Sequence, residues 1–280
     1  MNKPDSVSAS AILAAANLIA DADALLITSG AGMGIDSGLP DFRGENGFWN
    51  AYPALGNLGI SFTQIANPKA FRQHPELAWG FYGHRLQLYR DTLPHEGFRR
   101  LLQLAAQMPL GMRHFTSNVD GQFQKAGFES QHVTQCHGSI HMLQCMDQCG
   151  QAVWPADDFQ PQVDVALCLL TSALPTCPAC GALARPNILM FGDWDFEGQR
   201  YAQSESNLLA WRARARRLVV IEIGAGTTIP SARDFGSAMD CPLIRINPSE
   251  YQVGLSRDIS IVLGAQDALI AITDALKLSS

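Results

Sequence analysis

Residues 28–44 read Thr-Ser-Gly-Ala-Gly-Met-Gly-Ile-Asp-Ser-Gly-Leu-Pro-Asp-Phe-Arg-Gly, and this stretch decides the expected fold. It follows the apolar run Ala24-Leu25-Leu26-Ile27, which is typical of a short buried parallel strand. The glycines therefore stand at the carboxyl end of a strand, where α/β folds bind ligands, and they let a phosphate approach the backbone. Ile35 occupies the place of the third glycine in the usual dinucleotide fingerprint. We therefore expect a loop that binds phosphate. A hydride-transferring dehydrogenase is the least favoured of the candidate functions.

The composition fits an ordinary soluble enzyme. The chain has 280 residues, of which 47% are apolar and 16% charged, and its net charge is −6. This balance gives no general attraction to nucleic acid or to an anionic membrane. The apolar stretch 11–20 imitates a signal-peptide core, but Asp5 precedes it and Asn17 interrupts it, which favours a helix. We therefore expect a cytoplasmic protein.

Strand-like and helix-like segments alternate along the chain, which predicts a doubly wound parallel sheet. A glycine-rich loop is expected from Gly30 to Gly47, and mainly helix from Phe48 to Asp91. The expected strands are residues 24–28, 113–117, 133–136, 187–191, 218–223, 243–246 and 259–262.

Four cysteines in two close pairs, Cys145-x3-Cys149 and Cys177-x2-Cys180, interrupt this alternation. Disulfides are unusual in a cytosolic chain, whereas two such pairs offer four thiolates to a tetrahedral zinc ion. Gly150 and Gly181, directly after the pairs, suit tight turns. Four thiolates leave no open coordination position, so we predict a structural zinc site.

Polar or glycine-rich residues follow several of the expected strands. They are Gly30 to Gly38, Asn118 to Asp120, His137, and Gly224 to Thr228. Because ligands of such folds gather at the carboxyl ends of the strands, these residues are expected to form one site.

Together these residues resemble the sirtuin family of NAD-dependent protein lysine deacylases, of the bacterial type. The resemblance runs in the family's order over residues 10–275. It is carried by Gly30 to Arg43, Asn118-x-Asp120, Cys136-His137-Gly138, the paired cysteines, Phe191-Gly192-Asp193 and Ile246-Asn247-x-x-Glu250.

The resemblance implies an α/β fold with two domains. The Rossmann-like NAD-binding large domain would comprise residues 1–47, 92–140 and 187–280. The small domain would combine a helical part, residues 48–91, with a zinc-binding part, residues 141–186. NAD and an acylated lysine of a protein substrate would meet between the two domains.

The resemblance also assigns roles to residues. His137 would be the general base, Asn118 would face the nicotinamide ribose and Asp120 the carboxamide. The implied cofactor-binding residues are Gly30, Ala31, Gly32, Gly34, Asp41, Phe42, Arg43, Ser117, Asn118, Asp120, Gly224, Gly226, Thr227, Asn247 and Gln266. Phe191 and Gly192 would contact the substrate. A neutral imidazole suits the removal of a ribose proton near neutral pH. Asn118 and Asp120 also fit a simple Asx-turn before Gly121, so that interpretation stays open.

Tyr82-x-x-Arg85 resembles the pair by which the demalonylating and desuccinylating sirtuins recognise an acidic acyl group. At i and i+3 the two side chains share one helical face, and an arginine pairs well with a carboxylate. A helix with Tyr82 in the core and Arg85 snorkelling to solvent explains the pair equally well.

Two other functions remain open. A protein ADP-ribosyltransferase on the same fold would use the same nicotinamide cleavage, and a non-catalytic NAD-responsive protein would bind the nucleotide without cleaving it. We expect acylated protein substrates, no nucleic-acid or membrane partner, and a monomer or weak oligomer.

Overall fold

The computed structural model describes the backbone of residues 5–40 and 44–279 and the side chains of residues 9–40 and 48–276. Its main sheet has six strands in the order β11-β10-β9-β1-β2-β3, and every neighbouring pair is parallel. The strands are β1 (Ala24–Ser29), β2 (Met112–Thr116), β3 (Val133–Gln135), β9 (Leu218–Ile223), β10 (Leu243–Ile246) and β11 (Ile259–Ile261). The predicted doubly wound parallel sheet is confirmed.

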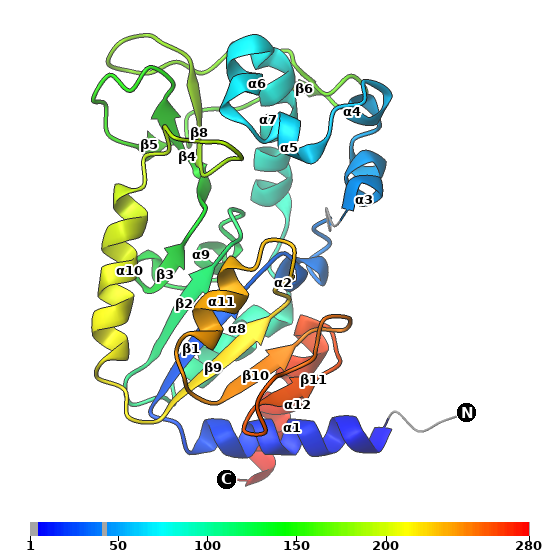
Figure 1. Cartoon of the computed structure of the whole chain (residues 1–280), viewed down its shortest axis with the longest axis vertical. Helices are drawn as coiled ribbons and strands as arrows, with labels where there is room; N and C mark the ends of the chain where they lie inside the picture. The colour runs from blue at the N-terminus through cyan, green and yellow to red at the C-terminus, as the bar shows by residue number, and fades with distance from the viewer. Residues whose placement is uncertain (1–4, 41–43, 280) are drawn as a thin grey trace.

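Helices cover both faces of this sheet (Figure 1). Leu25 and Ile27 of β1 pack with α1 (Asp5–Ala20), α8 (Glu96–Ala105) and α12 (Ala265–Ser279). Leu26 points to the opposite face and packs with α10 (Gln199–Arg212) and α11 (Ser231–Ser237). Successive residues of a strand face opposite sides, so a strand covered on both faces is apolar throughout. None of the described helices is long and apolar enough to cross a lipid bilayer.

A second group of elements forms its own core in the upper part of Figure 1. Its helices are α3 (Gly44–Ala51), α4 (Pro53–Asn57), α5 (Phe62–Ile65), α6 (Pro68–Gln73) and α7 (Pro75–Asp91). Its strands are β4 (Gly138–Cys145), β5 (Trp154–Pro155), β6 (Val163–Asp164), β7 (Leu169–Leu170) and β8 (Ala184–Ile188). The indole N–H of Trp79 on α7 donates to the Ala184 carbonyl at 2.9 Å, so the helical part and the cysteine-containing part are joined.

Three short elements complete the described chain, namely α2 (Gly32–Ile35), α9 (Gln122–Lys125) and the 3₁₀ turn η1 (Ser130–His132). Two predictions about local structure are wrong. The glycine-rich segment 30–47 is not all loop, because it contains α2 and the start of α3. The strand expected at 187–191 is β8 at 184–188, which pairs antiparallel with β4 outside the main sheet. β8 ends at Ile188, and the next N–H, that of Leu189, donates to the His137 carbonyl. The apolar residues 189–191, which suggested that the strand continued, lead into a turn instead.

Candidate active site

The loops that follow β1 and β9 touch at the carboxyl edge of the main sheet. A Cβ atom on Gly30 would lie 2.8 Å from the Gly224 carbonyl oxygen, and one on Gly32 would lie 2.6 Å from the Gly224 Cα. Gly224 itself has φ of +58°, a conformation that favours glycine. These three glycines therefore bring two backbone segments together, with Gly30 and Gly224 buried and Gly32 half-buried. Glycine-rich loops at the carboxyl edge of a parallel sheet are the kind of backbone that a pyrophosphate approaches closely.

The other residues of the first loop have different positions. Ala31 precedes α2. A Cβ on Gly34 would lie 2.8 Å from Leu39 Cδ1, so a larger residue there would displace the Leu39 side chain. Asp41, Phe42 and Arg43, which the sequence assigned to the cofactor, lie outside the described residues.

The buried His95 supports this loop and was not predicted from the sequence. Its Nε2 lies 2.9 Å from the Met33 carbonyl oxygen, and its Nδ1 accepts from the Gly97 N–H at 3.0 Å. The imidazole therefore carries its proton on Nε2 and donates it to Met33. Gln266 also lies at this edge, where its backbone N–H donates to Asp36 Oδ2 at 2.8 Å. The side chain of Gln266 accepts from the N–H of Glu96 at 3.3 Å.

The segment after β2 is joined to the glycine loop through Ser117 and Asn118. The Ser117 N–H donates to the Ser29 carbonyl at 3.1 Å. The Asn118 Nδ2 donates to the Gly30 carbonyl at 2.9 Å. Because the amide nitrogen is engaged there, its carbonyl oxygen is the end of Asn118 that can accept from a ligand hydroxyl.

Asp120 is a buried carboxyl group two residues further on. Its Oδ1 accepts from the Gln122 N–H at 2.9 Å, so the Asx-turn interpretation is confirmed for Asp120, whereas the Asn118 side chain donates to Gly30 instead. Burial raises the pKa of Asp120 to about 6, although the guanidinium of Arg85 opposes this shift. His141 packs beneath the turn, with its Nε2 2.9 Å from the Asp120 carbonyl oxygen. Sequence analysis assigned no function to His141.

His137 lies directly after β3, with its side chain half-buried. Its Nδ1 is 3.1 Å from the Ser117 carbonyl oxygen, and its Nε2 is 3.2 Å from Ser231 Oγ. A carbonyl oxygen only accepts, so the proton is on Nδ1 and Nε2 carries the lone pair. Burial lowers the pKa of His137, and the hydrogen bond to Ser117 opposes this shift. The imidazole is therefore neutral near pH 7 and able to accept a proton through Nε2.

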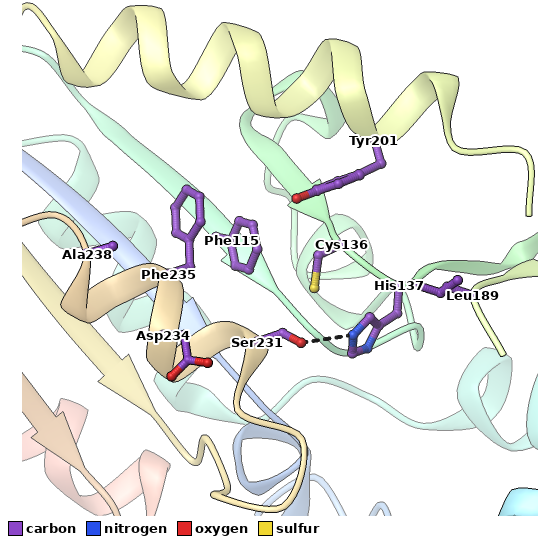
Figure 2. Close-up of a pocket in the computed structure, with 9 residues that line it drawn as sticks. All are labelled: Phe115, Cys136, His137, Leu189, Tyr201, Ser231, Asp234, Phe235 and Ala238. Atoms are coloured by element: carbon purple, nitrogen blue, oxygen red, sulfur yellow. Dashed lines mark hydrogen bonds between the residues drawn. The ribbon is translucent and has the colours of Figure 1, made fainter. Parts of the chain in front are cut away.

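Figure 2 shows the cavity of about 470 Å³ beside His137. Its walls come from β2, the turn after β3, the segment after β8, and helices α10 and α11. The lining residues are Phe115, Cys136, His137, Leu189, Tyr201, Ser231, Asp234, Phe235 and Ala238.

The loop after β9 contains the second group of predicted cofactor residues. Gly226 is half-buried and Thr227 is exposed, so both are accessible to a ligand. Asn247 is completely buried beneath this loop. Its Nδ2 donates to the Ala225 carbonyl at 3.1 Å, and its Oδ1 accepts from the N–H of Glu250 at 3.0 Å. Asn247 therefore shapes the loop from below.

Phe191 and Gly192 form a turn between β8 and α10, and this turn contacts the helical part of the small domain. The Phe191 N–H donates to the Ala66 carbonyl at 2.9 Å, and Gly192 has φ of +64°. The turn is held by a buried ion pair that sequence analysis missed, in which Arg185 Nη2 lies 2.9 Å from Asp193 Oδ1.

Tyr82 and Arg85 both lie in the interior of the small domain. Tyr82 is 1% exposed and Arg85 is 8% exposed. The Arg85 guanidinium donates from Nη2 to Tyr89 Oη at 2.6 Å and lies 5.2 Å from the centre of the Phe81 ring. Tyr82 is in the core as one interpretation expected, but Arg85 does not snorkel to solvent.

The four cysteines of the two pairs converge. All four sulfur atoms lie within 4.8 Å of one another, with Cys145 and Cys180 3.7 Å apart and Cys149 and Cys177 3.6 Å apart. A tetrahedral zinc ion with Zn–S bonds of about 2.3 Å requires sulfur separations of roughly 3.8 Å, so the residues fit this metal. Gly150 (φ +88°) and Gly181 (φ +76°) have the turn conformations predicted for them.

The structure thus brings the glycines of two loops, Asn118, Asp120 and His137 to one edge of the sheet, while the cysteines form a separate cluster. Tyr82 and Arg85 lie in the second core, with Arg85 near enough to Asp120 to influence its pKa. Among α/β proteins, this fold and site define a nucleotide-binding class with an attached four-cysteine metal module.

Comparison with known proteins specifies the family. The model of the Sir2 family matches residues 30–208, and the chain belongs to this family. It is 27% identical to an NAD-dependent protein deacylase of Aquifex aeolicus over 256 residues, which cover 90% of this chain and 95% of the relative. An NAD-dependent protein deacylase of Thermococcus kodakarensis is 32% identical over 219 residues, covering 78% of this chain and 76% of the relative.

The fold agrees with that of a solved Sir2 homologue in complex with NAD. The TM-score is 0.71 at 23% identity, and the similarity covers 94% of this chain and 93% of that one. At this identity the likeness establishes the fold, and the function is argued from the site.

Proposed function

We propose that the protein is an NAD-dependent protein lysine deacylase, which uses NAD to remove an acyl group from lysine side chains of protein substrates. The observation that carries this proposal is the neutral imidazole of His137, with its Nδ1 fixed by Ser117 and its Nε2 lone pair directed at Ser231 in the wall of the cavity. The names of the relatives from Aquifex aeolicus and Thermococcus kodakarensis support the same activity.

NAD is the co-substrate in this proposal, and its nicotinamide–ribose bond is the one that is cleaved. The surface around Gly30, Gly32 and Gly224 holds the pyrophosphate. Asn118 accepts from a ribose hydroxyl through its carbonyl oxygen. Asp120 accepts from the carboxamide, and His137 Nε2 takes a ribose hydroxyl proton. The roles of Asp41, Phe42 and Arg43 in closing the site over the co-substrate remain predictions.

The zinc ion that we assign to the four cysteines has a structural role. With four thiolate ligands it has no open position, so it supplies stability to the small domain and no catalytic chemistry. Arg72 of α6 supports this arrangement by donating to the Met146 carbonyl at 3.2 Å, next to Cys145.

An acidic acyl group, such as succinyl or malonyl, is a second candidate substrate. Arg85 lies on the same helical face as Tyr82, and a guanidinium pairs well with a carboxylate such as that of a succinyl or malonyl group. Burial raises the pKa of Tyr82 to about 12, so its hydroxyl keeps its proton and can donate. Conversely, the contact between Arg85 and Tyr89 is also consistent with a structural role.

A panel of acetyl, succinyl and longer acyl peptides with NAD tests both candidates. Arg85→Met should lower desuccinylation at least tenfold and leave deacetylation within about threefold. Equal effects on both peptides would reject the acidic-acyl proposal. An assay with radiolabelled NAD tests the ADP-ribosyltransferase alternative. If the label accumulates on protein and no free lysine is released, deacylation is rejected.

The remaining proposals concern the organisation of the molecule. We propose the division into a large domain (residues 1–47, 92–140 and 187–280) and a small domain (residues 48–91 and 141–186). We also propose a cytoplasmic monomer or weak oligomer without nucleic-acid partners, which the net charge of −6 supports.

A further inference from the structure

Nε2 of His137, the nitrogen that would accept the ribose proton, has a partner in the protein to which the proposed function gives no role. Ser231 Oγ lies 3.2 Å from His137 Nε2, and Figure 2 shows the hydroxyl directed at the imidazole. Since Nδ1 donates to Ser117, the neutral Nε2 accepts from the Ser231 hydroxyl. This bond uses the same lone pair that would receive the ribose proton.

The position of Ser231 is set by the packing of α11, whose first residue it is. The ring of Phe235 stacks on that of Phe115, with centroids 3.7 Å apart and an interplanar angle of 6°. Arg233 Nη2 donates to the carbonyl oxygens of Ala225 at 2.8 Å and Glu250 at 2.9 Å. Contacts with β2 and with the loop after β9 therefore fix the start of α11, and with it the Ser231 side chain.

The geometry points to Ser231 as a positioning residue for His137. With Ser117 on Nδ1 and Ser231 on Nε2, the imidazole is held at both nitrogens, and its lone pair keeps the direction of the Ser231 hydroxyl before the co-substrate enters. A ribose hydroxyl can then replace the Ser231 hydroxyl as donor without rotation of the ring. This inference rests on the proposed function, because it takes His137 as the base.

Kinetics of Ser231→Ala and Ser231→Thr test the positioning role. Loss of one neutral hydrogen bond corresponds to a factor of about 2 to 13. Ser231→Ala should therefore lower kcat for lysine release within that range, with the KM for NAD changed less than twofold. Ser231→Thr retains the hydroxyl and should restore most of the rate. Ser237→Ala, at the exposed end of the same helix, is the matched control.

A double-mutant cycle separates positioning from general damage to the fold. In a His137→Ala background, Ser231→Ala should cause no further loss, because the group that it positions is absent. An equal loss in both backgrounds would overturn the inference. An unchanged or faster Ser231→Ala enzyme would also overturn it.

Nitrogen NMR of ¹⁵N-histidine protein gives a readout that does not depend on turnover, with His137→Ala identifying the signals. Wild-type His137 should have a protonated Nδ1 and a non-protonated, hydrogen-bonded Nε2. In Ser231→Ala, the ¹⁵N chemical shift of Nε2 should move toward that of an imidazole nitrogen without a proton or a hydrogen bond. In Ser237→Ala, this chemical shift should stay unchanged. A protonated Nε2, or one insensitive to Ser231→Ala, would reject the inference even in an active deacylase. A wild type without lysine release would reject the proposed function alone.

Discussion

Replacing Arg185 with methionine should destabilise the protein and loosen the turn that carries Phe191 and Gly192. Arg185 and Asp193 both have side chains that are at most 1% exposed, so the change leaves a buried carboxylate without its cation. Breaking such a pair costs about 3–5 kcal/mol. Asp193 still accepts from the N–H groups of Met190 at 3.3 Å and Asp195 at 3.1 Å, which favours the lower end of that range.

Thermal and urea unfolding measure this loss. At roughly 2–4 °C per kcal/mol, a loss of about 3 kcal/mol lowers Tm by about 6–12 °C. The KM for an acyl peptide should rise while NAD binding stays near the wild-type value, because the turn contacts the helical part of the small domain through Ala66 and Phe62. The double variant Arg185→Met/Asp193→Leu removes both charges and should recover part of the stability, because the N–H groups of Met190 and Asp195 lose their acceptor. A single variant within 1 kcal/mol of wild type, or a double variant no more stable than the single, would refute this reasoning.

Three further changes test other parts of the account. Asp120→Asn should stabilise the protein above pH 6, because folding raises the pKa of this carboxyl from 3.8 to about 6. The gain in the free energy of unfolding, up to about 3 kcal/mol, should disappear as the pH falls toward 4. Urea unfolding of both proteins across this pH range measures the gain. Gly32→Ala should weaken NAD binding at least tenfold by calorimetry, because its Cβ would lie 2.6 Å from a backbone atom of Gly224; unchanged affinity would contradict the contact between the loops. Metal analysis should find about one zinc per chain, lost in Cys177→Ser together with the folded small domain; a metal-free wild type would exclude the assigned ion.

The main sheet could be predicted because its strands have local signals. β9 and β10 begin and end at the predicted residues, since each is buried on both faces and apolar except for one charged residue. Those two residues, Glu222 in β9 and Arg245 in β10, form an ion pair with each other. The prediction for β8 began and ended three residues too late. The buried polar residues Arg185 and Asn187 interrupt the apolar pattern within the strand, whereas the apolar run after it is typical of a strand. The cysteine cluster was predictable from spacing alone.

The supporting residues of the site could not be predicted, because their contacts are distant in sequence. His95 binds Met33 across 62 positions, and Ser231 binds His137 across 94. Neither His95 nor Ser231 belongs to a recognisable local pattern. The reason for the glycines also differed from the expectation. Gly30 and Gly32 are required by the approach of Gly224, whereas sequence analysis expected them to open the backbone to a phosphate.

The stoichiometry of the reaction with an acyl peptide tests the central claim most directly. Mass spectrometry should find one nicotinamide and one O-acyl-ADP-ribose for each free lysine produced by the wild type. His137→Ala should reduce lysine release at least a hundredfold, the loss typical of removing a general base. The same change at the half-buried His132, which sequence analysis did not assign to the site, should have little effect. Lysine release without consumption of NAD, or a His137→Ala enzyme as active as the wild type, would contradict the account.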